Sequence, residues 1–251
     1  MRESFDIRRL LKSWPYDPDH EARIVAGDDG REILQVRTPL GIEQLEMEGR
    51  PDGERPHGME SALEYQAERL AEVTRAGTEA EFELDEEDCS ELFAEGTLYY
   101  FRYVRLFQLK RWSETVRDTA RNLRAFDLIH RHAAREEDRN NLEKWRPYVV
   151  RMNAIASAFL TLDKGDHSQA LAILQGAISR IEGLEELEDE TFVFERTRSL
   201  GALREVAAQI EQARPLSALE QLEKQLRRAI DQQQFERAAE LRDRIRMLKS
   251  E

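Results

Sequence analysis

The chain has 251 residues, of which 40% are hydrophobic and 35% are charged, and its formal net charge at pH 7 is -13. This composition is too apolar for a disordered chain, and no apolar run approaches the roughly 20 residues that cross a bilayer. The single cysteine, Cys89, excludes an internal disulfide and any zinc or redox site built from cysteine pairs. Residues 1–12 lack a signal-peptide pattern, so we expect a cytoplasmic protein.

Three short stretches near the N-terminus carry the alternation that is typical of β-strands. Residues 21–26, 31–38 and 42–48 alternate apolar and polar positions, and turn-forming residues separate them. The pattern predicts a three-stranded antiparallel meander. Because three strands alone form a marginal sheet, another part of the chain must cover the apolar face. The nearest candidates in sequence are Trp14–Tyr16 and the helix predicted to begin near Met59.

Two Arg-Pro-x-Gly units follow the predicted sheet, at Arg50–Gly53 and Arg55–Gly58. Proline presets the second position of a β-turn and glycine suits the last, so each unit predicts a turn that holds its arginine beside it. Arg50 and Arg55 could therefore form a loop site for an anion or a partner protein. The alternative is a rigid connector, which the turn chemistry alone already explains.

From Met59 to its end the sequence predicts helices. Gly77 ends the first of them, Asp85 is a candidate N-cap for the next, and Pro147 suits a first helical turn. The predicted helices before the C-terminal segment cover residues 59–76, 92–109, 112–132, 147–162, 167–181 and 187–213.

Two pairs of these helices resemble tetratricopeptide repeats. The resemblance rests on Leu106–Val116 and on Ala158–Leu171, which follow that family's pattern of helix, tight turn and second helix, with the small residue Ala170 at the place where paired helices approach. It implies helical hairpins packed side by side, and with them a peptide-binding groove.

The charge is unevenly distributed along the chain. Residues 100–151 carry an excess of basic residues, whereas residues 1–100 are strongly acidic. Either the basic stretch faces the acidic part within the molecule, or it forms a surface for an anionic partner such as nucleic acid. We favour the internal arrangement, because aromatic residues are not interleaved with the basic ones as they are in nucleic-acid-binding surfaces.

No set of residues predicts catalysis. The five histidines are scattered, and His130 and His132 point in different directions on a predicted helix, so they cannot share a metal ion. Cys89 has no basic neighbour in sequence that would lower its pKa. The aromatic residues from Tyr99 to Phe107 occur at helical spacing, which favours a place in the core. We therefore expect no catalytic residue, no metal site and no cofactor.

Beyond Pro215 the sequence predicts a separate helical hairpin. Ser217 and Glu220 form a capping box, and residues 231–234 interrupt the apolar pattern and reverse the chain. A hairpin of about 33 residues buries too little apolar area to fold securely by itself, so it needs a partner surface. Two apolar stripes are expected to face each other, one of Leu219, Leu222, Leu226, Ala229 and Ile230, the other of Phe235, Ala238, Ala239, Leu241, Ile245 and Leu248.

The second stripe is similar to the signature of the UVR motif of UvrB and UvrC. Phe235–Ile245 carries the pattern Phe-Glu-x-Ala-Ala-x-x-Arg-Asp-x-Ile. The chain lacks the phosphate-binding loop of UvrB-like helicases and Clp ATPases, and it lacks the cysteine pairs of McsA-like activators. An ordinary amphipathic hairpin or coiled coil is the alternative. The resemblance implies association with another protein through Leu222, Leu226, Phe235, Ala238, Ala239, Leu241, Arg242, Asp243 and Ile245.

Together these patterns predict an α+β protein that is mostly α. It has a small β-meander region at 1–58, a helical domain at 59–213 and a UVR hairpin at 214–251, on a hinge around Arg214–Pro215. The leading hypothesis is a non-enzymatic adaptor whose hairpin binds a UVR-bearing or groove-bearing protein, or a second copy of itself. One alternative is an accessory factor of nucleotide excision repair that contacts UvrB-like or UvrC-like proteins. Another is a ligand-binding or enzymatic role around Arg50 and Arg55. We expect no membrane partner.

Overall fold

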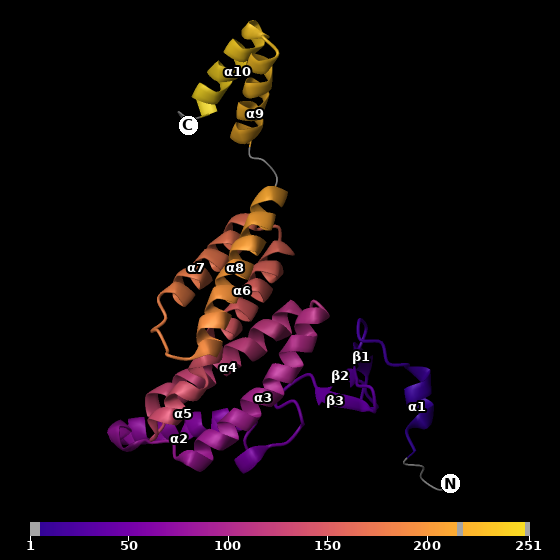
Figure 1. Ribbon diagram of the computed structural model, residues 1–251, viewed down its shortest axis with the longest axis vertical. Helices are drawn as coiled ribbons and strands as arrows, with labels where there is room; N and C mark the ends of the chain where they lie inside the picture. Colours follow the sequence, from indigo (N-terminus) through magenta and orange to yellow (C-terminus); the bar gives the residue numbers. More distant parts are fainter. Residues whose placement is uncertain (1–5, 215–217, 249–251) are drawn as a thin grey trace. The chain divides into compact units, whose positions relative to one another are not determined.

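The computed structural model describes residues 6–214 and 218–248 (Figure 1). The chain divides into two compact units, residues 1–207 and 208–251. The first unit contains the sheet and most of the helices, and the second contains the C-terminal hairpin. The fold is α+β and mostly α, as predicted.

The N-terminal sheet is the predicted antiparallel meander. Its strands are β1 (Ala22–Ala26), β2 (Glu32–Arg37) and β3 (Ile42–Glu46), in the order β1-β2-β3. In the register, Leu34 of β2 lies opposite Ile24 of β1 and Leu45 of β3. These three residues therefore share one face of the sheet, because residues directly opposite each other point to the same side.

The cover of this apolar face differs from the prediction. The face packs against Leu106 of α3 (Glu86–Gln108), and its buried residues are Leu34, Val36, Leu45 and Met47. The helix that follows Met59, α2 (Ala62–Ala76), packs in another cluster. Trp14 lies beneath Arg23, whose guanidinium carbon is 3.9 Å from the ring centroid. Leu106 is far from the strands in sequence, so no local pattern could identify it as the cover.

The predicted helices of the first unit are all present. Neighbouring helices pack as the pairs α3–α4, α4–α6 and α6–α7, so the two predicted hairpins form, but the tetratricopeptide resemblance itself is not confirmed. The short helices α1 and α5 were not predicted. Besides α2 and α3, the α-helices are α1 (Arg8–Ser13), α4 (Trp112–His132), α5 (Glu136–Asn141), α6 (Arg146–Leu162), α7 (His167–Glu182) and α8 (Glu190–Ala213), and the short 3-10 helices are Pro56–Gly58, Glu79–Glu81 and Glu143–Trp145.

Local chemistry sets the helix boundaries where the sequence indicated it. Gly77 ends α2 with a φ of 76°, in the left-handed region that favours glycine. The Asp85 side chain accepts hydrogen bonds from the backbone N–H groups of Glu87 and Asp88 at the start of α3, each at 2.9 Å. The predicted end of α2 at Gly77 and the predicted N-cap of α3 at Asp85 are thereby confirmed.

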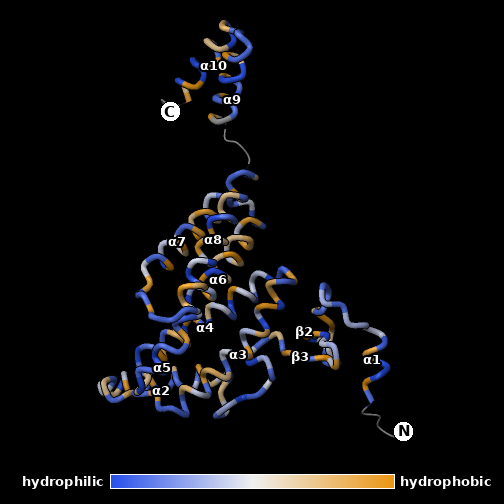
Figure 2. The backbone as a smooth tube through the Cα atoms, viewed as in Figure 1, coloured by the Kyte–Doolittle hydropathy of each residue, from blue (hydrophilic) through white to orange (hydrophobic). Residues whose placement is uncertain are grey.

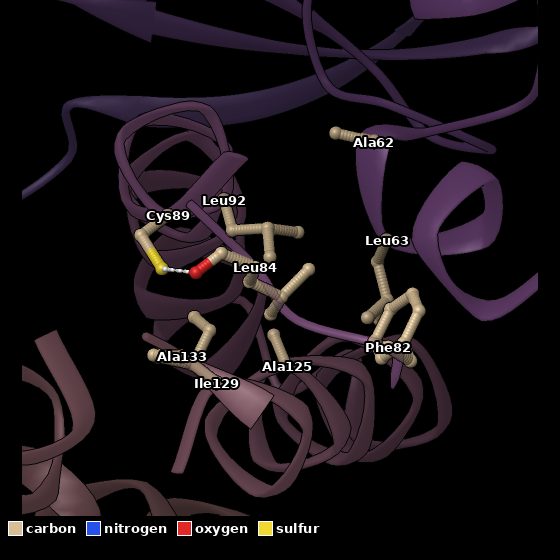
Figure 3. Packing of buried hydrophobic residues seen from close by; sticks show 9 residues of the cluster. All are labelled: Ala62, Leu63, Phe82, Leu84, Cys89, Leu92, Ala125, Ile129 and Ala133. Carbon is tan, nitrogen blue, oxygen red and sulfur yellow. Dashed lines mark hydrogen bonds between the residues drawn. The ribbon is translucent and has the colours of Figure 1, made fainter. Parts of the chain in front are cut away.

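One hydrophobic core cluster of the first unit lies where α2, α3 and α4 meet (Figure 3). Cys89 is fully buried in it, and its Sγ lies 4.0 Å from the carbonyl oxygen of Leu84. Burial raises the pKa of the Cys89 thiol to about 12. The other residues of the cluster are Ala62, Leu63, Phe82, Leu92, Ala125, Ile129 and Ala133.

A buried ion pair fastens the sheet to the helices. Arg102 of α3 and Asp118 of α4 are both fully buried, and two hydrogen bonds of 2.7 and 2.8 Å join the guanidinium to the carboxylate. Nη1 of Arg102 also donates to the carbonyl oxygens of Glu46, at 2.7 Å, and Gly49, at 2.9 Å. One arginine therefore connects two helices with the end of β3.

A second buried carboxylate caps α2. The backbone N–H groups of Ala62 and Leu63 donate to Glu95 of α3, at 2.7 and 3.1 Å. Negative charge is favourable there because the N-terminus of a helix carries a partial positive charge. Arg121 pairs with Glu95, and Nη1 of Arg50 lies 3.7 Å from it, so the charge is compensated.

The arginines of the basic stretch turn toward the acidic N-terminal part of the chain. Five of them pair with glutamates that precede residue 100, which agrees with the internal arrangement and not with a free basic surface. The pairs are Arg105–Glu21, Arg111–Glu32, Arg117–Glu48, Arg124–Glu64 and Arg135–Glu86.

Candidate functional site

The C-terminal segment forms the predicted helical hairpin. Its helices are α9 (Ala218–Asp231) and α10 (Phe235–Leu248), and they pack against each other. Gln233 has a φ of 57°, and the N–H of Gln234 donates to the carbonyl oxygen of Ala229 at 2.8 Å, which closes α9 and reverses the chain. The predicted break at Pro215 and the Ser217 capping box lie outside the described residues.

The hairpin has a small core. Among its described residues, Ala229, Leu241 and Ile245 are the buried apolar ones, and Leu222, Leu226 and Ala238 are half-buried. Figure 2 shows hydrophobic residues recurring along α9 and α10 between hydrophilic ones. Five of the nine residues predicted to bind a partner are among these buried and half-buried residues.

 These five residues, with Ala229 of the first predicted stripe, hold the hairpin together. The five are Leu222, Leu226, Ala238, Leu241 and Ile245.

The other predicted partner-binding residues are exposed. Phe235 is 71% exposed at the start of α10, and Ala239 follows one helical turn later. Arg242 and Asp243 come one turn further and pair with each other at 3.2 Å, with both side chains largely in solvent. Since residues three and four apart share a side of a helix, these four form one surface, here termed the outer face.

The two predicted stripes do not face each other over their whole length. Phe235 and Ala239 lie outside the core of the hairpin, and Leu248 at the end of α10 is 44% exposed. Ile230, placed in the first stripe, is 52% exposed just before the turn. Ile230 and Phe235 therefore present apolar surface on either side of the turn. The sequence pattern missed this because a stripe of apolar residues does not show which of its edges is covered.

The N-terminal arginines have different surroundings. The turns that precede Gly53 and Gly58 close with N–H to carbonyl hydrogen bonds of 2.9 and 3.1 Å, as the Arg-Pro-x-Gly pattern predicts. The Arg50 side chain is only 14% exposed, because it turns inward between Asp52 and Glu95. Arg55 is exposed.

Within residues 6–214 and 218–248, no group of three or more histidine, cysteine, aspartate or glutamate side chains is arranged to hold a metal ion. None of the helices described for this chain is long and apolar enough to cross a membrane.

The comparisons with known proteins concern the hairpin. Residues 217–251 match the family model described as the UvrB/uvrC motif, which confirms the predicted UVR resemblance. No curated protein and no solved structure matches the chain.

Proposed function

We propose that this protein is a non-enzymatic adaptor that binds another protein through the outer face of its UVR hairpin. The UVR motif is known in DNA repair and in protein interaction. The observation that carries the proposal is the exposure of Phe235: an aromatic residue of the motif is 71% exposed and is not used by the core of the hairpin.

The exposed ring supplies a contact of useful strength. Burying a phenylalanine side chain that was in solvent stabilises a complex by about 1.5–3 kcal/mol, and aromatic residues are frequent among the residues that dominate binding. Ala239 lies one turn from Phe235, and its small side chain lets a partner helix approach α10 closely. Ile230 extends the apolar surface across the turn.

The charged part of the outer face suits specificity. The pair formed by Arg242 and Asp243 is exposed, and exposed pairs contribute only about 0.2–1 kcal/mol. Breaking this pair therefore costs little free energy, so each side chain can pair with a group of the partner protein instead. Arginine can then bind a carboxylate with two hydrogen bonds, which fixes orientation as well as adding energy.

The small core of the hairpin supports the same function. A two-helix unit with so few buried apolar residues is marginally stable by itself, so a partner that covers Phe235 also stabilises the hairpin. We therefore expect the free energy of unfolding of the hairpin to rise when the partner is bound.

The test compares the wild type with a Phe235→Ser, Ala239→Asp double variant in a quantitative pull-down from the source organism. The matched control is Phe194→Ser, because Phe194 is 61% exposed but lies on α8 in the first unit. Circular dichroism must show unchanged helicity for each variant. We expect the wild type and the Phe194→Ser control to capture the same partner, and the double variant to lose it. Identical partners for all three proteins would contradict the proposal.

Sedimentation of the purified proteins distinguishes a second copy from a different partner. If the hairpin binds itself, the wild type and Phe194→Ser associate at high concentration and the double variant stays monomeric. If all three stay monomeric, the partner is a different protein and the pull-down identifies it.

The description of the motif also favours a second candidate, an accessory role in nucleotide excision repair. In that case the retained partner is a UvrB-like or UvrC-like protein. Direct contact with DNA through residues 100–151 would appear as DNA binding that weakens steeply with salt. Absence of salt-sensitive DNA binding, together with a partner unrelated to UvrB and UvrC, would favour the general adaptor.

A further inference from the structure

A cavity of about 410 Å³ lies in the first unit, among α3, α4, α6 and α8. Its volume falls in the range of about 300–1,000 Å³ that is typical of small-molecule sites. The wall is mainly aromatic, and its six aromatic side chains are Phe93, Tyr100, Tyr103, Phe126, Trp145 and Tyr148. An aromatic wall with a few polar groups is the usual composition of a binding pocket.

One wall of the cavity carries a buried carboxylate that lacks a hydrogen bond. Glu195 of α8 is 5% exposed and lines the cavity, and its Oε2 has no hydrogen-bond partner. Arg151 Nη2 lies 3.8 Å from Oε2, and Arg198 Nη1 lies 3.5 Å from Oε1. These two guanidinium groups more than compensate the single charge of Glu195, but neither of them hydrogen-bonds Oε2. A buried polar atom without a partner costs about 1–3 kcal/mol. Oε2 itself is covered, so a ligand in the cavity would recover that energy by turning the carboxylate toward itself and donating to it.

The combination selects a cation. The faces of aromatic rings are negative and attract ammonium groups, and an adjacent carboxylate adds to that attraction. Arg198 is largely exposed and weakly held, so a ligand ammonium can take its place beside Glu195. An anionic ligand could pair with Arg198, but it would lie next to the carboxylate and would leave Oε2 without a donor. The unbonded oxygen requires a hydrogen-bond donor, and among donors the aromatic wall favours one that carries a positive charge.

We propose that this cavity binds a small amphipathic amine, with the ammonium group donating to Glu195 and an aromatic or aliphatic body packed among the rings. Tyr100 and Tyr148, whose ring centroids are 6.1 Å apart, and the half-exposed Trp145 would contact that body. This site is separate from the hairpin, so the proposal does not depend on the function proposed above.

A glycine keeps one wall of the cavity open. Gly96 lies in the middle of α3, where glycine costs about 1 kcal/mol relative to alanine. A Cβ built at Gly96 would meet only Asn122 Oδ1, at 4.0 Å, and both residues line the cavity. A larger side chain at this position therefore fits the helix and extends into the cavity.

Three probes of similar size test the proposal on the wild-type protein: 2-phenylethylamine, 2-phenylethanol and 3-phenylpropionate. Binding is followed by NMR through the indole N–H of Trp145, assigned with Trp145→Phe. We expect the amine to bind about tenfold more tightly than the alcohol or the acid, which corresponds to about 1.4 kcal/mol. Tighter binding of the acid, equal binding of all three, or no binding up to about 10 mM would overturn the proposal.

Two variants then test the assigned residues. Glu195→Gln keeps the size of the side chain and should remove the preference for the amine over the alcohol. Gly96→Leu should block all three probes, whereas Gly176→Leu, at an exposed glycine of α7, should not. Unchanged binding to Gly96→Leu would overturn the location. If a variant does not fold, the comparison of the three probes on the wild type still decides.

Discussion

Asp118→Ala should destabilise the first unit more than any surface substitution, because it leaves Arg102 buried and without its anion. Both side chains are fully buried, and two hydrogen bonds join them. Removal of one partner of a buried ion pair costs about 3–5 kcal/mol. For a unit of this size, each kcal/mol corresponds to about 2–4 °C in melting temperature, so we expect a fall of roughly 6–20 °C.

Urea denaturation followed by circular dichroism measures the loss of unfolding free energy. Asp163→Ala is the matched control, because Asp163 is exposed at the end of α6. The control should change the free energy of unfolding by less than about 0.5 kcal/mol. A loss below about 1 kcal/mol for Asp118→Ala would refute the reasoning, since water would then have to reach Arg102.

Three further predictions concern two glycines, the buried cysteine and two buried tyrosines. Gly77→Ala should lower the free energy of unfolding by about 1 kcal/mol because of its positive φ, whereas Gly176→Ala, inside α7, should raise it by up to about 1 kcal/mol; urea denaturation measures both. Cys89, with its pKa raised to about 12 by burial, should not react with a thiol reagent near pH 8 until the protein is unfolded, and rapid labelling of the native protein would contradict this. Burial raises the pKa of Tyr99 and of Tyr148 to about 12, so the unfolded chain, with tyrosine pKa near 10, should release these protons first. The stability they contribute should be complete below about pH 10 and lost between about pH 10 and 12, and unfolding that is independent of pH in this range would contradict it.

The sequence predicted those features that neighbouring residues determine. Gly77 and Asp85 end and begin helices because their own conformation and hydrogen bonds act within a few residues. The alternation in residues 31–38 and the spacing from Phe235 to Ile245 likewise depend on local periodicity. Each of these signals correctly places a helix or a strand, although the apolar stripe of α10 is buried only in part.

Contacts between distant segments could not be predicted in the same way. Leu106 covers the sheet, and Arg102 donates to the carbonyl oxygens of Glu46 and Gly49. The sequence around these two α3 residues carries no sign that they contact the sheet. Charge counting left two arrangements open for the basic stretch. The ion pairs distinguish them only because folding brings each arginine to a particular glutamate, such as Arg111 to Glu32.

Both proposed sites lie where the ordinary rule of apolar inside and polar outside fails. On α8, Phe192 and Leu203 are buried apolar residues, but Glu195 and Ser199 occupy the same buried side, and each has a buried oxygen without a hydrogen bond. In the hairpin the exception is reversed, because Phe235 is apolar and exposed. Each exception costs free energy in the isolated protein, and a bound ligand or partner would remove that cost. Positions on an apolar stripe that hold a carboxylate, or on an exposed turn that hold an aromatic ring, therefore merit mutation first.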